Sequence, residues 1–114
     1  MFDLTIQRIR NSSGTELSLL REDLLPLACG GNKVRIAEKL IEDARQKGST
    51  VIVGYGNSRS NLCRVLSILC KMNGFGCVIV SPCDDYGARI ETINSRIVTK
   101  CGAVTVVCDG TDSV

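Results

Sequence analysis

The sequence predicts an α/β fold, in which a mainly parallel sheet built of βαβ units follows an N-terminal β-hairpin. One pattern behind this prediction is the alternation of short, β-branched apolar runs with longer segments that carry apolar side chains at helical spacing. A second is the apolar–polar alternation on both sides of an early turn cluster. The chain has 114 residues, of which 44% are hydrophobic. We therefore expect one hydrophobic core and a single, partial domain over residues 1–114.

The hairpin is predicted from two segments, Leu4–Ile9 and Glu16–Arg21, that alternate apolar and polar side chains. The turn formers Asn11–Gly14 lie between them. Residues 22–31 contain Pro26 and a glycine pair, and we expect them to form a loop.

Three helices and three strands are expected to follow in alternation. The first helix has an apolar stripe at helical spacing, and Gly48 follows its last turn. Strands that alternate with helices of this length imply right-handed crossovers and a parallel sheet. The expected helices are 33–47, 60–73 and 88–100, and the expected strands are 50–53, 76–80 and 103–107.

Composition excludes several classes of partner. The net charge is +2, the charges are interspersed, and aromatic residues make up 4% of the chain. Nucleic acid is therefore not an expected partner, because there is neither a basic stripe nor a stacking platform. No apolar run is long enough to span a bilayer, and no signal-peptide pattern begins the sequence, so we expect no membrane partner and a cytoplasmic location.

The seven cysteines favour a reducing compartment over a metal or disulfide framework. Their number is odd, no C-x-x-C pair occurs and histidine is absent. We expect them to act mainly as small buried hydrophobic residues, and we predict no metal site. The absence of histidine also means that proton transfer must use Lys, Tyr, Asp, Glu or a cofactor.

One lysine stands where a covalent cofactor could attach. Lys33 follows Gly30, Gly31 and Asn32 at the start of the first expected helix. A lysine that packs against a sheet loses solvent, and desolvation lowers an amine's pKa and makes it a nucleophile toward aldehydes. The alternative is a helix capped by Asn32, with Lys33 as a solvated surface charge.

A second cluster of small and polar residues follows the strand expected at 50–53. It includes Gly54, Gly56, Ser60 and Asn61. Ligands gather at the carboxyl ends of parallel strands, and the N–H groups of the next helix favour an anion there. Tyr55 lies beside this turn and could stack on a ring or donate a proton, or it could simply pack at the strand end.

The segments Arg21–Leu24 and Gly30–Arg35 together resemble the cofactor-lysine motif of a pyridoxal-phosphate family. That family includes D-cysteine desulfhydrase and aminocyclopropanecarboxylate (ACC) deaminase, and it shares the fold of the tryptophan synthase β subunit, fold type II. The resemblance runs from about Glu16 to the end of the chain.

A second block supports this resemblance. The turn Gly54–Gly56, the pair Ser60–Asn61 and Arg64 are similar to the family's glycine-rich turn, Ser-Asn pair and trailing arginine. The two blocks also stand in the family's order, one helix and one strand apart.

The resemblance implies a role for each of four residues. Lys33 would be the catalytic lysine that binds pyridoxal phosphate covalently, and Asn32 would help to orient it. Asn61 would hydrogen-bond the cofactor's phenolic oxygen, and Ser60 would lie beside the substrate carboxylate. The implied reaction is an elimination or deamination of a small amino acid.

The sequence also departs from the family pattern. Leu62 stands where the family usually has histidine, and Arg59 stands where it tends to have an uncharged residue. Family members are longer, and their second domain supplies the phosphate-binding loop and the partner of the pyridine nitrogen. We therefore expect an N-terminal portion that is inactive alone and that pairs with a complementing chain or with itself.

Two other functions remain open from the residues. Gly54 and Gly56 follow a strand as in a nucleotide-binding βαβ module, although Arg59 replaces the third glycine of that motif. The chain could also be a non-catalytic α/β remnant.

Overall fold

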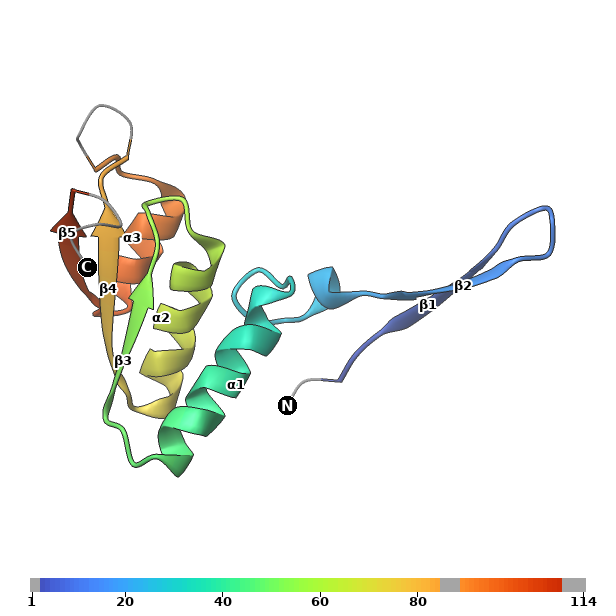
Figure 1. Cartoon of the computed structure of the whole chain (residues 1–114). Coiled ribbons are helices and arrows are strands. Elements are labelled where there is room, and N and C mark those ends of the chain that lie inside the picture. The colour runs from blue at the N-terminus through green and yellow to red at the C-terminus, as the bar shows by residue number, and fades with distance from the viewer. Residues whose placement is uncertain (1–2, 85–88, 110–114) are drawn as a thin grey trace.

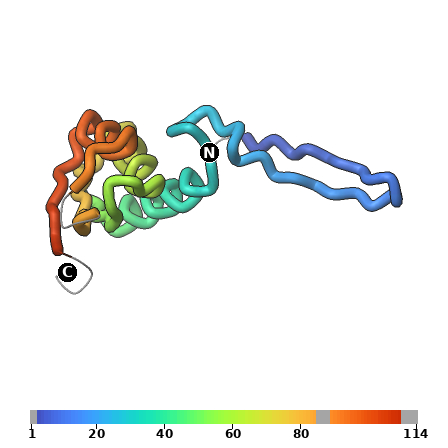
Figure 2. Tube along the Cα trace, turned by 90° about the horizontal axis from the view of Figure 1, so that it is seen from above, coloured from blue at the N-terminus to red at the C-terminus, as the bar shows by residue number. Residues whose placement is uncertain are grey.

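Figure 1 shows an α/β body from which a long hairpin projects. The computed structural model describes residues 3–84 and 89–109. Its longest dimension is 53 Å, and its Cα radius of gyration is 17.0 Å. A compact chain of this length would have a radius of gyration of about 13 Å. The difference reflects the hairpin, which extends away from the body in both views (Figure 2).

The hairpin joins β1 (Ile6–Arg10) and β2 (Glu16–Leu20) in antiparallel pairing, with Ile6 opposite Leu20. The side-chain oxygen of Asn11 accepts two backbone N–H groups and so closes the turn. The predicted hairpin is therefore confirmed. All ten strand residues are exposed, so the hairpin contributes little to the described core.

The body is a three-stranded parallel sheet, in which β4 (Gly76–Pro82) lies between β3 (Val51–Tyr55) and β5 (Val104–Cys108). Its helices lie on one face of the sheet (Figure 1), and buried residues accordingly alternate with more exposed ones along β3 and β4. None of the helices within residues 3–84 and 89–109 is long and apolar enough to cross a membrane. The helices are α1 (Lys33–Gln46), α2 (Asn61–Asn73) and α3 (Ile93–Lys100).

The core lies between the helices and the inner face of the sheet. Leu66 of α2 and Ile79 of β4 are each 1% exposed. A Cβ on Gly54 would lie 2.9 Å from Leu66 Cδ2 and 3.1 Å from Ile79 Cδ1. Glycine at this position therefore lets α2 approach the sheet closely. The other buried apolar residues of the core include Val34, Ala37, Ile41, Ile52, Val65, Leu69 and Val98.

The third helix is shorter than the prediction, since α3 begins at Ile93 rather than at residue 88. Thr92 caps it and forms a reciprocal capping box with Ser95. In addition, the Asp84 carboxylate accepts the backbone N–H of Ile90 at 2.9 Å. These hydrogen bonds satisfy backbone groups outside a helix, and they explain the later start.

The three predicted strands of the body are confirmed, but two of them end later than predicted. The strand expected to stop at residue 53 continues to Tyr55, because Gly54 and Tyr55 pair with Ile79 and Val80. β4 likewise continues to Pro82, where it pairs with Cys108.

Candidate functional site

The first two helices of the body start at the same end of the molecule. α1 leads into β3 and α2 leads into β4 through short turns, so both helices run antiparallel to the parallel strands (Figure 1). Arg45 near the end of α1 donates to Oδ1 of Asn73, the last residue of α2, at 2.9 Å. Lys33 and Asn61 each lie twelve residues earlier, about 18 Å along the helix axis. Both therefore stand at the carboxyl edge of the sheet.

The backbone that leads into Lys33 has an unusual conformation. Ala28, Cys29, Gly30 and Gly31 all have positive φ, at 54°, 67°, 68° and 91°. Alanine and cysteine adopt this region at a cost of about 1–2 kcal/mol each, whereas glycine does so freely. A strained segment immediately before the predicted catalytic lysine is consistent with a functional constraint on its position.

Gly30 closes this loop against the short 3₁₀ helix Glu22–Leu24. A Cβ on Gly30 would lie 2.6 Å from the backbone oxygen of Asp23. The N–H of Gly31 donates to the backbone oxygen of Glu22 at 2.7 Å. The segment expected to be an irregular loop is thus a tight structure that fixes where α1 begins.

One ion pair, between Arg35 and Glu22, joins the same loop to the first turn of α1, and a second, between Arg35 and Glu38, lies within the helix. Arg35 lies 3.5 Å from Glu22 and 3.2 Å from Glu38, and all three side chains are largely buried, at 20–24% exposure. Partial burial makes such pairs more effective than those on an open surface. The loop and α1 are therefore held together around Lys33.

The two residues at the start of α1 differ in exposure. Lys33 is half-buried, and Asn32 is exposed. Asn32 occupies the N-cap position, but it has helical φ and ψ values and its side chain makes no capping hydrogen bond. Of the two alternatives, the one in which the Asn32 side chain caps the helix is therefore wrong, and its amide is not used for capping.

Ser60, by contrast, is a helix cap. Its Oγ accepts the backbone N–H of Cys63 at 3.2 Å. A Cβ on Gly56 would lie 2.7 Å from Ser60 Oγ and 2.8 Å from Cys63 Sγ. Burial raises the pKa of the Cys63 thiol, which favours its protonated form. Gly56 thus allows close packing against α2.

The side-chain amide of Asn61 has a fixed orientation. Its Oδ1 accepts hydrogen bonds from Arg64 Nη1 at 2.7 Å and from Asn94 Nδ2 at 3.1 Å. Asn94 itself donates to the backbone oxygen of Arg59 at 2.9 Å and accepts from Arg64 at 2.9 Å. Because a guanidinium only donates and a backbone carbonyl only accepts, the orientation of both amides is determined. Asn61 therefore keeps its NH₂ group available to donate.

Asn94 is a residue that the sequence analysis did not identify. It comes from α3, 33 residues after Asn61. Its only local signal is a polar side chain in the first turn of a helix, which is common. Arg64 is the trailing arginine of the second motif, and the structure shows it hydrogen-bonded to two asparagines.

Asp84 has a structural role in the loop after β4. Its side chain is fully shielded from solvent, and it accepts a hydrogen bond from the Ser58 hydroxyl at 2.9 Å. The backbone N–H of Ile90 and this hydroxyl lower the pKa of the Asp84 carboxyl. Asp84 thus joins the loop after β4 to Ser58 and Ile90, and the next residue, Asp85, lies outside the described residues.

The side chain of Tyr55 does not lie on the side of the sheet that carries the helices. Its neighbours along β3, Ile52 and Gly54, are buried beneath the helices, whereas Val51, Val53 and Tyr55 are exposed on the other face. The sheet therefore separates the Tyr55 side chain from the helix side.

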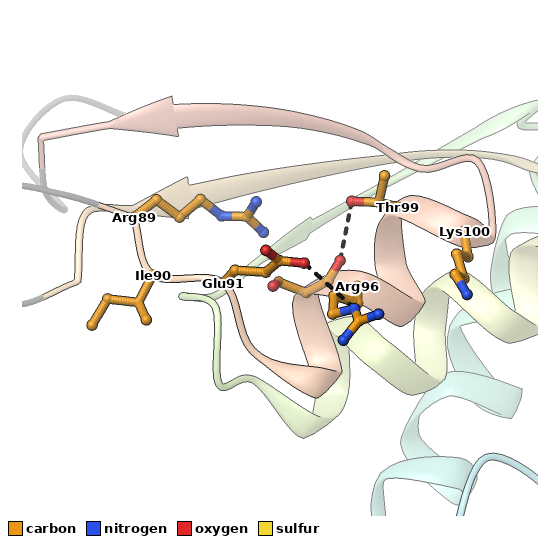
Figure 3. A pocket seen from close by; sticks show the side chains of 7 residues that line it. Arg89, Ile90, Glu91, Arg96, Thr99 and Lys100 are labelled. Atoms are coloured by element: carbon orange, nitrogen blue, oxygen red, sulfur yellow. Dashed lines mark hydrogen bonds and ion pairs between the residues drawn. The ribbon is translucent and has the colours of Figure 1, made fainter.

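Clear hollows occur elsewhere on the described residues. One of about 390 Å³ lies along α3, where Arg89, Glu91 and Arg96 surround it and Glu91 pairs with Arg96 at 3.4 Å (Figure 3). Another of about 470 Å³ lies between Leu4 and the groove of α1 and α2. Neither is lined by Lys33 or Asn61.

The family model for "Pyridoxal-phosphate dependent enzyme" matches residues 4–113. The chain belongs to this family. A D-cysteine desulfhydrase from Yersinia enterocolitica is 32% identical over 108 residues, which are 92% of this chain and 33% of that protein. The D-cysteine desulfhydrase of Klebsiella pneumoniae is 34% identical over 91 residues, 80% of this chain and 27% of that protein. This family is pyridoxal-phosphate dependent.

Solved structures confirm the predicted fold type. A crystal structure of an ACC deaminase homologue superposes with a TM-score of 0.76 and 30% identity, and it covers 99% of this chain and 34% of its own. A hydrogen sulfide-producing enzyme from Fusobacterium nucleatum shares the fold at a TM-score of 0.65 and 23% identity. The chain thus has part of the fold type II architecture and spans about a third of the length of its curated relatives.

Proposed function

We propose that this chain supplies the lysine-bearing part of a pyridoxal-phosphate enzyme that acts on a small amino acid by elimination or deamination. The observation that carries the proposal is the placement of Lys33 and an oriented Asn61 at the same end of two neighbouring helices. The D-cysteine desulfhydrase relatives and the ACC deaminase homologue favour this class of substrate.

The residues at this edge fit one side of the cofactor. The amine of Lys33 suits the aldehyde carbon, and the free NH₂ of Asn61 suits a phenolic oxygen, which accepts hydrogen bonds. Asn32, whose amide does not cap the helix, is available to orient the lysine. The groups that bind the phosphate and the pyridine nitrogen would come from the two-thirds of the family fold that this chain does not span.

Each side chain then has a defined task. When bound, pyridoxal phosphate supplies an electron sink for the carbanion that forms at the substrate Cα. Lys33 would hold the cofactor by binding its aldehyde carbon through Nζ, and its amine, when free, would be the base that takes the proton from the substrate Cα. Ser60 uses Oγ as an acceptor in its cap, so its hydroxyl hydrogen is left to donate to the substrate carboxylate.

We also propose that the isolated chain is inactive. Because it lacks the residues that contact the cofactor's phosphate group, we expect weak cofactor binding and no turnover. We also propose a cytoplasmic location, because all seven cysteines are free thiols.

The test is reductive trapping of pyridoxal phosphate on the 114-residue chain with borohydride, followed by peptide mapping. Trapping is irreversible, so it detects a weak but specific site. We expect Lys33 to be labelled in preference to the exposed Lys39 and Lys47, and Lys33→Ala to remove the preferred label. Equal labelling of all lysines would refute the proposal.

A second arm tests the orientation of Asn61. Asn61→Ala and Asn94→Ala should both reduce the preference for Lys33, because each removes or releases the amide that donates to the cofactor. Asn73→Ala is the matched control, since that asparagine bonds Arg45 at the opposite end of α2. A control that reduces labelling as much as Asn94→Ala would argue for a general loss of structure.

A further inference from the structure

A hollow beside α3 gathers positive charge on the body. Its volume is about 390 Å³, which is within the range of about 300–1,000 Å³ that is usual for sites of small ligands. Three cations line it, Arg89, Arg96 and Lys100, together with one carboxylate, that of Glu91. The lining side chains therefore carry a net charge of +2. We call this feature the α3 hollow.

Arg89 is anchored in the fold at the edge of the α3 hollow. The residue is half-buried, and its Nε donates at 3.3 Å to Oγ of Ser81, a residue of β4 that is 0% exposed. A guanidinium has five N–H donors, so this hydrogen bond leaves the terminal Nη groups, which Figure 3 shows directed toward α3. Among the residues that the structure describes, no carboxylate pairs with Arg89. A positive charge that is partly removed from water without a counter-charge favours the binding of an anion.

The described carboxylates near the α3 hollow do not neutralise it. Glu91 lies 3.4 Å from Arg96, but the two side chains are 76% and 62% exposed, and ion pairs at such exposure are weak. The Asp84 carboxylate is already engaged, since it accepts the N–H of Ile90 and lies 3.8 Å from Arg59. The α3 hollow therefore keeps an excess of positive charge.

The charge and the lining indicate the chemistry of the ligand. A phosphate monoester carries between about −1.5 and −2 at pH 7, which balances the α3 hollow better than the single charge of a carboxylate. Guanidinium groups also match phosphate oxygens in a bidentate arrangement, and a lysine ammonium adds a point charge. Ile90 lines the α3 hollow as well. A smaller hollow of about 190 Å³, which shares Arg96 and Lys100, is lined by Ile93 and Ile97. These apolar side chains suit an organic group attached to the phosphate.

We propose that the α3 hollow binds the phosphate monoester of a small organic molecule, with Arg89 and Arg96 in contact with the phosphate group. This site is distinct from the edge of the sheet that carries Lys33, because α2 lies between α1 and α3 (Figure 1). Binding there does not require the proposed cofactor chemistry.

Titration of phenyl phosphate into the ¹⁵N-labelled 114-residue chain tests the site. Amide shifts in two-dimensional NMR spectra should change mainly within residues 89–100, and isothermal titration calorimetry gives the dissociation constant. We expect Arg89→Gln and Arg96→Gln each to raise this constant by about tenfold or more, since each removes charge-assisted hydrogen bonds. Benzoate is the matched probe, with the same ring and a single charge, and it should bind at least about tenfold more weakly.

Further variants separate an electrostatic site from a loss of structure. Glu91→Gln removes the carboxylate from the lining and should tighten the binding of phenyl phosphate by about two- to threefold, which damage to the fold would not do. Arg8→Gln is the matched control, because Arg8 is 77% exposed in the hairpin and its replacement removes the same charge. It should leave the affinity within about twofold, and Lys33→Ala should do the same.

Four outcomes would overturn the proposal. They are no binding of phenyl phosphate, shifts spread over the whole chain, benzoate bound as tightly as phenyl phosphate, and equal losses of affinity in Arg8→Gln and Arg96→Gln. Weaker binding in a folded Glu91→Gln variant would also contradict it. Circular dichroism checks that each variant folds, and the comparison of the two probes needs the wild type alone.

Discussion

At the scale of single residues, hydrogen-bond chemistry decides what the candidate site can offer. Arg64 has only donors, so it must meet the oxygen of Asn61, and the NH₂ group is then directed elsewhere. The same reasoning fixes Asn94 between Arg64 and the backbone oxygen of Arg59. A carboxylate at position 61 would also satisfy Arg64, but it would present no donor to a phenolic oxygen.

The buried carboxylate of Asp84 predicts a dependence of stability on pH. The N–H of Ile90, the hydroxyl of Ser58 and the nearby Arg59 guanidinium lower the pKa of Asp84 below its usual value. A lowered folded-state pKa stabilises the fold above the unfolded-state value, about 3.9, and this contribution is lost as the pH falls through the folded-state pKa. Asp84→Asn should therefore reduce the loss of stability below about pH 4.

Urea unfolding of the wild type and the variant between about pH 2 and 6 measures this difference. Ser58→Ala removes one of the donors to Asp84 and should give an intermediate pH dependence. Parallel stability curves for the wild type and Asp84→Asn would contradict the prediction.

The positions of some of these residues can be predicted from the sequence, and those of others cannot. Lys33 and Asn61 stand in contiguous motifs, so their proximity to turns and helix starts could be predicted. Asn94 could not, because its contact with Asn61 depends on how α3 packs beside α2. The exposure of Tyr55 on the far face follows from the continuation of β3 through Gly54, where the sequence predicted a turn.

At the scale of secondary-structure elements, the loop before α1 determines where the lysine stands. Gly30 has φ +68°, and a Cβ there would lie 2.6 Å from the backbone oxygen of Asp23. Gly14, in the hairpin turn, has φ +84° with open space around it. Gly14→Ala should cost about 1 kcal/mol of unfolding free energy, from the left-handed backbone alone. Gly30→Ala should cost more than about 2 kcal/mol, because the main chain must also move.

Denaturant unfolding of the two variants measures these costs. Gly30→Ala should also reduce the preferred trapping at Lys33, whereas Gly14→Ala should not. Equal destabilisation by both substitutions would show that the contact with Asp23 is relieved at no cost.

The start of α3 depends on one sequence signal that the prediction missed and on one contact that the sequence cannot reveal. The apolar spacing suggested a helix from residue 88, but Thr92 and Ser95 form a capping box that begins it at Ile93. Threonine is a favoured N-cap residue, so the sequence did contain the signal. What it could not contain is the hydrogen bond from Ile90 to Asp84, which joins two separate segments.

At the scale of the whole molecule, the two parts of the chain differ in how they are stabilised. The body has a core of side chains from helices and strands. The hairpin, in contrast, is exposed along both strands and depends on its own pairing, its turn and a hydrogen bond from Arg21 to Gln7. Isolated two-stranded hairpins are marginally stable in water, so the hairpin should unfold independently of the body.

A chain that lacks residues 1–20 tests this independence. Because the deleted strands bury almost nothing, we expect the unfolding free energy of the body to change by less than about 1 kcal/mol, a shift in Tm below about 8 °C. Leu25→Ala is the contrasting variant: Leu25 is 5% exposed within the core, and its truncation should cost about 2–5 kcal/mol. Thermal unfolding followed by circular dichroism measures both. Loss of cooperative unfolding in the shortened chain would mean that the groove between Leu4 and the α1–α2 pair couples the hairpin to the core.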